Sequence, residues 1–323
     1  MIHERHTMAP HLKTAIVTGA CSGMGLALTQ HLLSKPDWKV VVADVRPEQY
    51  RKIESTLNSE RHIFVHADVG SWESQAQLYQ RAFDWSGGRL DFLAANAGVV
   101  RVEPLAVTTV GDLDSKPTKP EMLTTQINQI GVYYGLLWFI HYVRRSKKAH
   151  ADKNGDYKPK AVLMSSCTAI YPFPCAVEYA MTKAAVLSLT RSTAHFLYKS
   201  DGIALNCLMP NYVNTQHYSD ETCDRWGPDW LTPYSTILRA YDELISEDGT
   251  VVQDGKSSGT PGVIKVGQSV ECSVLNLHYR HAQPFVDEKA EFVILESSKP
   301  EGEWFNTFLS PMTKYKATAT IQS

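Results

Sequence analysis

The sequence has 323 residues, of which 43 % are hydrophobic and 20 % charged, as is typical of a folded protein with a sizeable core. A formal net charge of −2 argues against a nucleic-acid-binding surface, and no apolar run reaches the roughly 18 residues of a membrane-spanning helix. The polar first residues do not resemble a secretory signal, and the six cysteines show no metal-ligand spacing. We therefore expect reduced cysteines, no metal centre and a cytoplasmic location.

The first half of the chain alternates short apolar runs with helical patterns. The apolar runs predict strands at Lys13–Thr18, Lys39–Asp44, Arg61–Asp68 and Leu90–Ala95. Helices are predicted between them at Gly23–Leu33, Pro47–Leu57 and Trp72–Phe83. Because apolar strands alternate with helices, the pattern predicts an α/β fold, with a parallel sheet covered by helices on both faces.

The alternation resumes after a polar loop at Leu105–Pro120. Long helices are predicted at Glu121–Arg145 and Val177–Tyr198, an exposed charged segment at Lys147–Lys160, and strands at Lys160–Ser165, Ile203–Met209 and Gly267–Leu277. The pattern is irregular after Pro210. We expect one catalytic domain over residues 1–275, with a mobile lid at about 211–260, and a C-terminal extension over residues 276–323.

A glycine-rich turn connects the first predicted strand to the first helix. Gly19, Gly23 and Gly25 have the spacing G-x-x-x-G-x-G. Glycines at such places allow a tight turn and let backbone N–H groups approach a pyrophosphate. A glycine-rich turn alone is weak evidence, but its position between a strand and a helix favours a dinucleotide site.

An acidic residue, Asp44, ends the second strand 19 residues after Gly25. A carboxylate there accepts hydrogen bonds from both ribose hydroxyls of an adenosine and repels a 2′-phosphate. Arg46 is the only nearby cation for such a phosphate, so we expect NAD, with NADP as the less favoured cofactor. The structural alternative for Asp44 is a cap or turn residue.

A tyrosine and a lysine, Tyr179 and Lys183, are four residues apart on a predicted helix and therefore share a face. A phenol with a pKa of about 10 is a poor base, but a nearby ammonium and a cationic nicotinamide ring favour the phenolate. Chance alone supplies about one such pair in a chain of this composition. Ser166, 13 residues before Tyr179, is placed to bind the same substrate oxygen, and Asn128 to hold a water that leads to the lysine. Taken alone, Ser166 is better explained as a helix or turn cap and Asn128 as a core amide with its hydrogen bonds satisfied.

Taken in order, these motifs resemble the short-chain dehydrogenase/reductase family. The motifs are TGACSGMG, Asp44, Asp68-Val69, NAG at 96–98, Asn128, Ser166, YAMTK at 179–183 and PNYVNT at 210–215. The resemblance covers about residues 13 to 215 and the last strand. It implies a doubly wound, seven-stranded parallel Rossmann sheet and a catalytic tetrad of Asn128, Ser166, Tyr179 and Lys183. Within the family, the chain is similar to the group of 15-hydroxyprostaglandin dehydrogenase and its fungal relatives.

The resemblance also implies a set of cofactor-binding residues along the carboxyl ends of the strands. In it, Val213 and Thr215 contact the nicotinamide amide, and Lys183 binds the ribose. The full set is Gly19, Ser22, Gly23, Met24, Gly25, Asp44, Val45, Asp68, Val69, Asn96, Ala97, Gly98, Tyr179, Lys183, Pro210, Val213 and Thr215. One departure is Pro210-Asn211, where the family has Pro-Gly; asparagine tolerates the left-handed backbone that such a turn needs.

The segment between Ser166 and Tyr179 is predicted to form the wall of the substrate pocket. Aromatic residues after the nicotinamide loop extend that wall, unless they pack a core. The candidate substrate residues are Thr168, Ile170, Tyr171, Phe173, His217 and Trp226. Residues 276–323 either cover the site, reach a partner subunit or form an inert surface.

Together these features predict an oxidoreductase that transfers a hydride between a nicotinamide cofactor and a bulky, mostly apolar secondary alcohol or ketone. We expect a homodimer or homotetramer whose ligand is a small molecule. The alternative is the same dinucleotide-binding scaffold used as a non-redox catalyst or regulatory sensor. The complete tetrad favours the redox enzyme. A methyltransferase-like protein would leave the Tyr–Lys pair and Ser166 unexplained.

Overall fold

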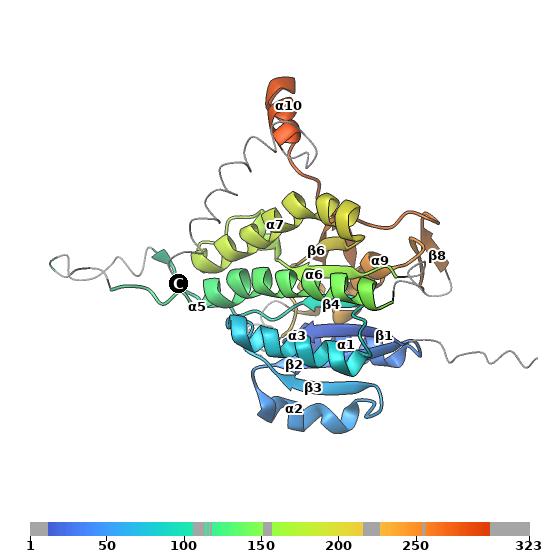
Figure 1. The fold of residues 1–323 in the computed structure, drawn as a ribbon. Coiled ribbons are helices and arrows are strands. Elements are labelled where there is room, and N and C mark those ends of the chain that lie inside the picture. The colour runs from blue at the N-terminus through green and yellow to red at the C-terminus, as the bar shows by residue number, and fades with distance from the viewer. Residues whose placement is uncertain are drawn as a thin grey trace, which may run out of the picture. The chain divides into compact units, whose positions relative to one another are not determined.

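The computed structural model describes residues 12–105, 114, 116, 118–150, 157–215, 227–253 and 256–297. The chain forms two units, Met1–Arg280 and His281–Ser323. The first unit is built on a sheet of eight strands (Figure 1). In spatial order these are β10 (Asn276–Tyr279), β9 (Ser269–Ser273), β6 (Ala204–Pro210), β5 (Lys160–Met164), β4 (Phe92–Ala95), β1 (Lys13–Thr18), β2 (Trp38–Asp44) and β3 (His62–His66).

Two layers of helices cover the sheet, as the sequence predicted. One face packs against α3 (Trp72–Ser86), α6 (Gly131–Ala149) and α7 (Val177–Asp201). The other packs against α1 (Gly23–Ser34) and α9 (Tyr234–Ile245). Because both faces are covered, the parallel strands are nearly continuous runs of buried residues, which is why they appear in the sequence as apolar stretches rather than alternating patterns.

The order of the strands creates a crevice at the centre of the sheet. β1 pairs with both β2 and β4 in parallel, so the chain moves outward from β1 in one direction and from β4 in the other. At such a switch point the connecting loops diverge and leave room at the carboxyl ends of the strands. The motifs of the glycine turn and of residues 96–98 both lie there.

The prediction of a single last strand over Gly267–Leu277 was wrong. The segment forms an antiparallel hairpin of β9 and β10 joined by a two-residue turn, so residues 276–279 belong to the sheet and not to a C-terminal extension. Val274 in that turn has a φ of 49°, which is unfavourable for a β-branched residue. The hydroxyl of Thr236 donates to the Val274 carbonyl, and the Val274 N–H donates to Thr232, so neighbouring side chains hold the turn.

The predicted lid at about 211–260 contains a core helix. Ile237, Ala240, Tyr241 and Leu244 of α9 are at most 1 % exposed and pack on the sheet. After α9, β7 (Thr250–Gln253) and β8 (Lys256–Gly259) form a separate two-stranded sheet. Residues 234–245 therefore do not form part of a mobile lid.

Short helices complete the described elements. They are α2 (Pro47–Ile53), the 3₁₀ turns Glu54–Thr56, Cys167–Ala169 and Pro228–Trp230, α5 (Leu123–Thr125), the π-helical turn Gln126–Ile130 and α10 (Glu288–Ser297). The predicted helix at Glu121–Arg145 thus begins at Leu123, passes through the π turn and continues as α6. In the second unit, α10 exposes Phe292 and Val293. Within the described residues, no helix combines the length and apolarity needed to span a membrane.

Candidate active site

The glycine turn brings the backbone of β1, α1 and the loop after β4 unusually close together. Gly19 has a φ of +63°, and a Cβ built there would lie 2.9 Å from the Ala97 Cα. A Cβ on Gly25 would lie 2.2 Å from the Gly19 carbonyl oxygen. Both positions therefore require glycine, and the first turn of α1 directs its N–H groups toward the groove. This cradle has the shape and the donors that a pyrophosphate needs.

The end of β2 forms the polar edge of the same groove. Asp44 is only 4 % exposed, and its carboxylate accepts from the Cys21 N–H at 3.0 Å and from the Arg46 N–H at 3.1 Å. The Arg46 guanidinium donates to the Ser22 hydroxyl at 2.8 Å. An ionised carboxylate has about four acceptor positions, so Asp44 retains capacity for ribose hydroxyls.

The end of β4 supplies a buried acceptor. The Thr18 hydroxyl accepts from the N–H groups of Asn96 and Ala97, and the Asn96 amide donates to the Thr18 carbonyl. The Asn96 side-chain oxygen is buried and has no hydrogen-bond partner among the residues that the structure describes. Since buried polar atoms are normally paired, this oxygen fits a ligand that donates to it. The cradle, Asp44 and this orphaned acceptor together fit a dinucleotide.

All the predicted cofactor residues except Gly25 line two adjoining hollows. Ser22, Gly23, Val45, Asp68, Val69, Ala97 and Thr215 are among those that line the outer groove, with Gly19, Met24, Asp44, Asn96 and Gly98. Tyr179, Lys183, Pro210 and Val213 line the inner pocket. Met24, Asn96, Gly98 and Thr215 line both, so the two hollows are continuous. Sequence reasoning missed Val99, Val100 and Ile127, apolar neighbours that carry no motif.

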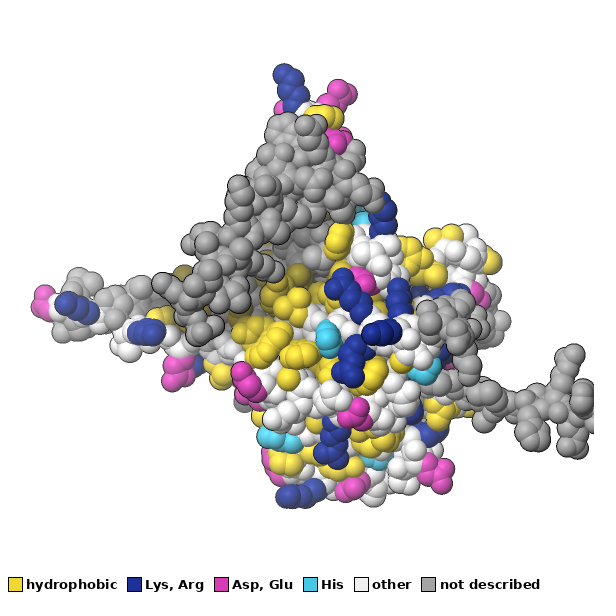
Figure 2. All heavy atoms as spheres, in the orientation of Figure 1, with side chains coloured by type: hydrophobic (Ala, Val, Ile, Leu, Met, Phe, Trp, Pro, Cys, Tyr) yellow, Lys and Arg dark blue, Asp and Glu magenta, His cyan; other side chains and the backbone are white. Residues whose placement is uncertain are grey.

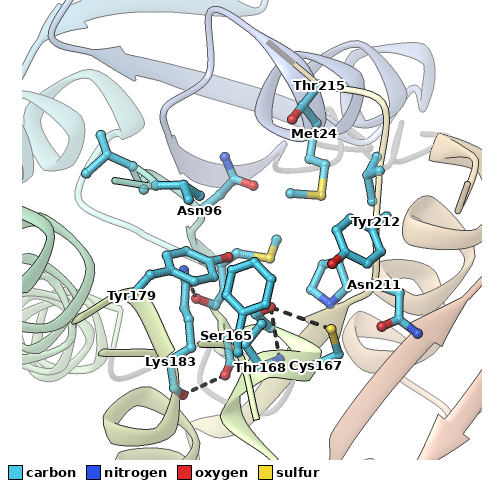
Figure 3. A pocket seen from close by; sticks show the side chains of 18 residues that line it. Met24, Asn96, Ser165, Cys167, Thr168, Tyr179, Lys183, Asn211, Tyr212 and Thr215 are labelled. Carbon is cyan, nitrogen blue, oxygen red and sulfur yellow. Dashed lines mark hydrogen bonds between the residues drawn. The ribbon is translucent and has the colours of Figure 1, made fainter. Parts of the chain in front are cut away.

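Tyr179 and Lys183 of α7 face the inner pocket (Figure 3). The Lys183 Nζ lies 5.4 Å from the centroid of the Tyr179 ring and donates to the Met164 carbonyl at 2.9 Å. Burial raises the pKa of the Tyr179 phenol to about 12, against an opposing hydrogen bond with Ser166. Burial likewise lowers the pKa of the Lys183 ammonium to about 8. Both groups thus resist ionisation in the protein alone, and a bound cationic ring would shift the phenol toward its ionised form.

Ser166 and its neighbour fix the pocket from β5. Ser166 caps the 3₁₀ turn that follows: its hydroxyl oxygen accepts from the Thr168 N–H at 3.2 Å. The Ser165 hydroxyl donates to the Lys183 carbonyl at 2.7 Å and so fastens α7 to the end of β5. The cap predicted as an alternative for Ser166 is therefore real, and it coexists with the interaction between Ser166 and Tyr179.

Asn128 lies in the π turn and is fully buried. Its amide accepts from the Val99 N–H and donates to the Val99 carbonyl, both at 2.8 Å. A weaker bond of 3.4 Å joins it to the Thr182 hydroxyl on α7. The side chain therefore positions the loop after β4 beside α7. Its water-holding role stays a prediction. π turns are rare in helices and occur often at functional sites.

The predicted substrate wall is only partly correct. Thr168 and Phe173 line the inner pocket, whereas Ile170 and Tyr171 are exposed and do not. His217 and Trp226 lie outside the described residues. Sequence reasoning missed Met164, Cys167, Asn211 and Tyr212, which also line the pocket.

These features define a dinucleotide-binding α/β protein with a tyrosine, a lysine and a serine beside the cofactor groove. Known proteins agree with this class. A family model described as short chain dehydrogenase matches residues 13–225. The chain belongs to the short-chain dehydrogenase/reductase family and is an oxidoreductase that binds a nicotinamide cofactor.

Individual relatives extend the comparison. Short-chain dehydrogenase/reductase prx6 of Penicillium rubens is 32 % identical over 280 residues, which cover 83 % of this chain and 86 % of the relative. NADP-dependent dehydrogenase M3 of Phoma sp. is 28 % identical over 213 residues, 65 % of this chain and 62 % of the relative. The crystal structure of 3-ketoacyl-(acyl-carrier-protein) reductase from Brucella melitensis complexed with NADH has a TM-score of 0.64 at 20 % identity, covering 82 % of this chain and 98 % of that one. The similarity to the 15-hydroxyprostaglandin dehydrogenase group stays a prediction.

Proposed function

We propose that the protein interconverts a bulky, mostly apolar secondary alcohol and its ketone, with Tyr179 as acid/base and NAD as cofactor. One observation supports this proposal above the others: Tyr179, Ser166 and Lys183 meet in a pocket that continues into the cofactor groove. A non-redox use of the scaffold would not need this convergence. The oxidoreductase is therefore preferred.

In the proposed mechanism, each residue acts on one oxygen or supports a residue that does. The Tyr179 hydroxyl gives its proton to the carbonyl oxygen in reduction and takes it back in oxidation. Ser166 holds the same oxygen by a hydrogen bond. Lys183, as a buried cation, stabilises the phenolate that remains. When bound, the nicotinamide cofactor supplies hydride transfer.

The substrate class follows from the lining of the inner pocket. Val99, Val100, Phe173, Tyr212 and Val213 give it an apolar and partly aromatic wall, and Lys183 is its only cationic lining residue in the described part of the chain. A strongly anionic substrate has no dedicated partner there. We expect the protein to oxidise hydrophobic secondary alcohols with NAD. The measurement is the increase in absorbance of the reduced cofactor. A panel of such alcohols and ketones that is inert with both NAD(H) and NADP(H) would contradict the proposal.

The preference for NAD is proposed from Asp44. Its buried carboxylate would accept from the adenosine ribose, whereas a 2′-phosphate would meet its negative charge. Arg46 lies at the same edge of the groove and donates to Ser22. Its guanidinium is the group there that would bind the 2′-phosphate of NADP. The relative from Phoma sp. is named as NADP-dependent, so the discrimination must be measured on this chain.

Changing Asp44 to alanine is expected to weaken NADH binding about tenfold and to improve the relative affinity for NADPH, because the ribose loses an acceptor and the phosphate loses a repelling charge. Titration of each cofactor into the two proteins gives the ratio of dissociation constants. Arg46→Ala serves as the matched control and should lower NADPH affinity only. Equal wild-type affinity for the two cofactors would overturn the NAD assignment.

We propose a homo-oligomer that buries an apolar strip on α6 and α7. Tyr133 and Leu137 of α6 and Met181 and Phe196 of α7 are 38–60 % exposed. Figure 2 shows hydrophobic side chains on the face where α6 lies. Light scattering after size exclusion should give a dimer or tetramer mass; a monomer at micromolar concentration would contradict this proposal.

A further inference from the structure

Asn211 brings an amide into the inner pocket at a position where the family motif has glycine. From the sequence, asparagine could preserve a left-handed turn there, but Asn211 does not have a left-handed backbone. Among the non-glycine residues that the structure describes, Val274 alone has a positive φ. The Asn211 N–H donates to the Cys272 carbonyl at 2.9 Å, so the backbone is held by β9 in an ordinary conformation. What the residue adds is its side chain, which lines the pocket.

A buried carboxylate binds this side chain from behind. Glu271 of β9 is 3 % exposed. One of its oxygens accepts from the Arg280 Nε at 2.6 Å and from the Tyr171 hydroxyl at 3.2 Å. The other accepts from the Asn211 Nδ2 at 3.1 Å. The Arg280 guanidinium forms an ion pair with this carboxylate, a charge-assisted hydrogen bond.

The chemistry of Glu271 fixes which way the Asn211 amide points. An ionised carboxylate has acceptors only, so the Asn211 nitrogen must face it. The amide is planar, with its oxygen on the opposite side from that hydrogen bond. The hydrogen-bond network therefore assigns an orientation in which the oxygen points away from Glu271. In Figure 3 the Asn211 nitrogen is drawn toward the neighbouring strand and the oxygen away from it.

We propose that Asn211 is a specificity-determining residue that accepts a hydrogen bond from a second hydroxyl, or an N–H, on the substrate. This inference rests on the proposed function of the site and narrows its substrate class to hydroxylated ketones and the matching diols. Glu271 is the positioning residue that keeps the acceptor turned inward. Pocket residues such as Val99, Val100 and Phe173 then contact the apolar body of the same molecule. Glycine at position 211 would provide no such acceptor.

Substrate pairs that differ only in the donor test the proposal. The three hydroxyacetophenones and their three methoxy counterparts keep the ketone and the ring, but methoxy groups cannot donate. For at least one ring position, the wild type should favour the hydroxy compound by about tenfold in kcat/KM, as expected for one buried hydrogen bond. Asn211→Gly should bring that ratio close to one. A ratio that stays unchanged in Asn211→Gly would overturn the proposal.

Glu271→Gln gives a sharper test because it should abolish the preference while Asn211 itself is kept. The Gln carbonyl would still accept from Arg280 and Tyr171, which leaves its NH₂ facing Asn211. Asn211 would then turn its oxygen toward Gln and its nitrogen toward the pocket. A hydroxyl and a methoxy oxygen can both accept from that nitrogen, so the ratio of the two kcat/KM values should fall to about one. Tyr171→Phe is the matched control, because Tyr171 contacts Glu271 without lining the pocket, and it should keep the wild-type ratio. If Glu271 had only a structural role, Glu271→Gln would lower kcat/KM for the hydroxy and methoxy compounds alike and leave their ratio unchanged, which would overturn the proposal.

Binding measurements separate this proposal from the proposed function. Calorimetric titration of the same pairs into Tyr179→Phe protein saturated with reduced cofactor measures the preference without turnover. A hydroxy preference that disappears in the Asn211→Gly/Tyr179→Phe double variant supports the role of Asn211 even if the wild type reduces neither compound. Equal affinity of Tyr179→Phe for the hydroxy and methoxy members of every pair, or no binding of any compound, would overturn the role of Asn211.

Discussion

Replacing Tyr179 by phenylalanine should lower kcat/KM by about a thousandfold, the range expected when a general acid is removed. The Tyr179 phenol is the proposed acid and lines the pocket from α7, and Ser166, which follows β5, lines the same pocket. Phenylalanine retains the ring and its packing but has no proton to transfer. The cofactor groove is formed largely by other elements, so the dissociation constant for NADH should change by less than about threefold.

Steady-state rates and a fluorescence titration of NADH, made on the same preparations, check both parts of this prediction. Tyr198→Phe is a suitable control because Tyr198 is an exposed tyrosine on α7, outside both hollows. Unchanged turnover in Tyr179→Phe would contradict the assignment of the acid. Loss of NADH binding along with turnover would indicate a folding defect instead.

Much of the fold was predictable because burial on both faces of the sheet leaves long apolar runs in the sequence. The hairpin of β9 and β10 could not be predicted for the same reason, because the apolar run continues through its turn. Val274 occupies a left-handed position in that turn, where glycine or asparagine would normally indicate a turn in the sequence. α9 did carry a signal. Its buried residues at 237, 240, 241, 244 and 245 have helical spacing, but they follow a stretch interpreted as a lid.

The site was predictable to the extent that it lies on rigid elements. Residues at the carboxyl ends of parallel strands lie close together independently of the loop conformations, and Tyr179 and Lys183 share one helical face. The substrate wall depends on how a loop folds. Tyr171 and Phe173 are only two residues apart, yet Tyr171 contacts Glu271 and Phe173 lines the pocket. The Asn211–Glu271 pair spans 60 residues and has no local pattern that would reveal it.

Lys183 shows why the site is costly to the fold. Lys183 is 3 % exposed, and the Met164 carbonyl is the only acceptor that its Nζ contacts among the described residues. Burial lowers its pKa from 10.5 to about 8, so at neutral pH the folded protein holds a charge that the unfolded chain holds more easily. Between pH 8 and 10.5 the unfolded state binds more protons at this group, and stability therefore rises with pH in that window. In the proposed mechanism this charge stabilises the Tyr179 phenolate, whereas its burial opposes folding.

Lys183→Met should consequently separate activity from stability. We expect kcat/KM to fall by at least about a hundredfold, since the phenolate loses its cation. The melting temperature without cofactor should be equal to or above that of the wild type at pH 7, because an apolar side chain of similar length replaces a buried charge. That advantage should shrink at pH 9, where the wild-type lysine is largely neutral when folded. Thermal melts of both proteins at the two pH values measure this difference. The prediction is contradicted if Lys183→Met melts well below the wild type, by the same margin at pH 7 and at pH 9. The hydrogen bond from the ammonium to Met164 would then stabilise the fold by more than burial of the charge destabilises it.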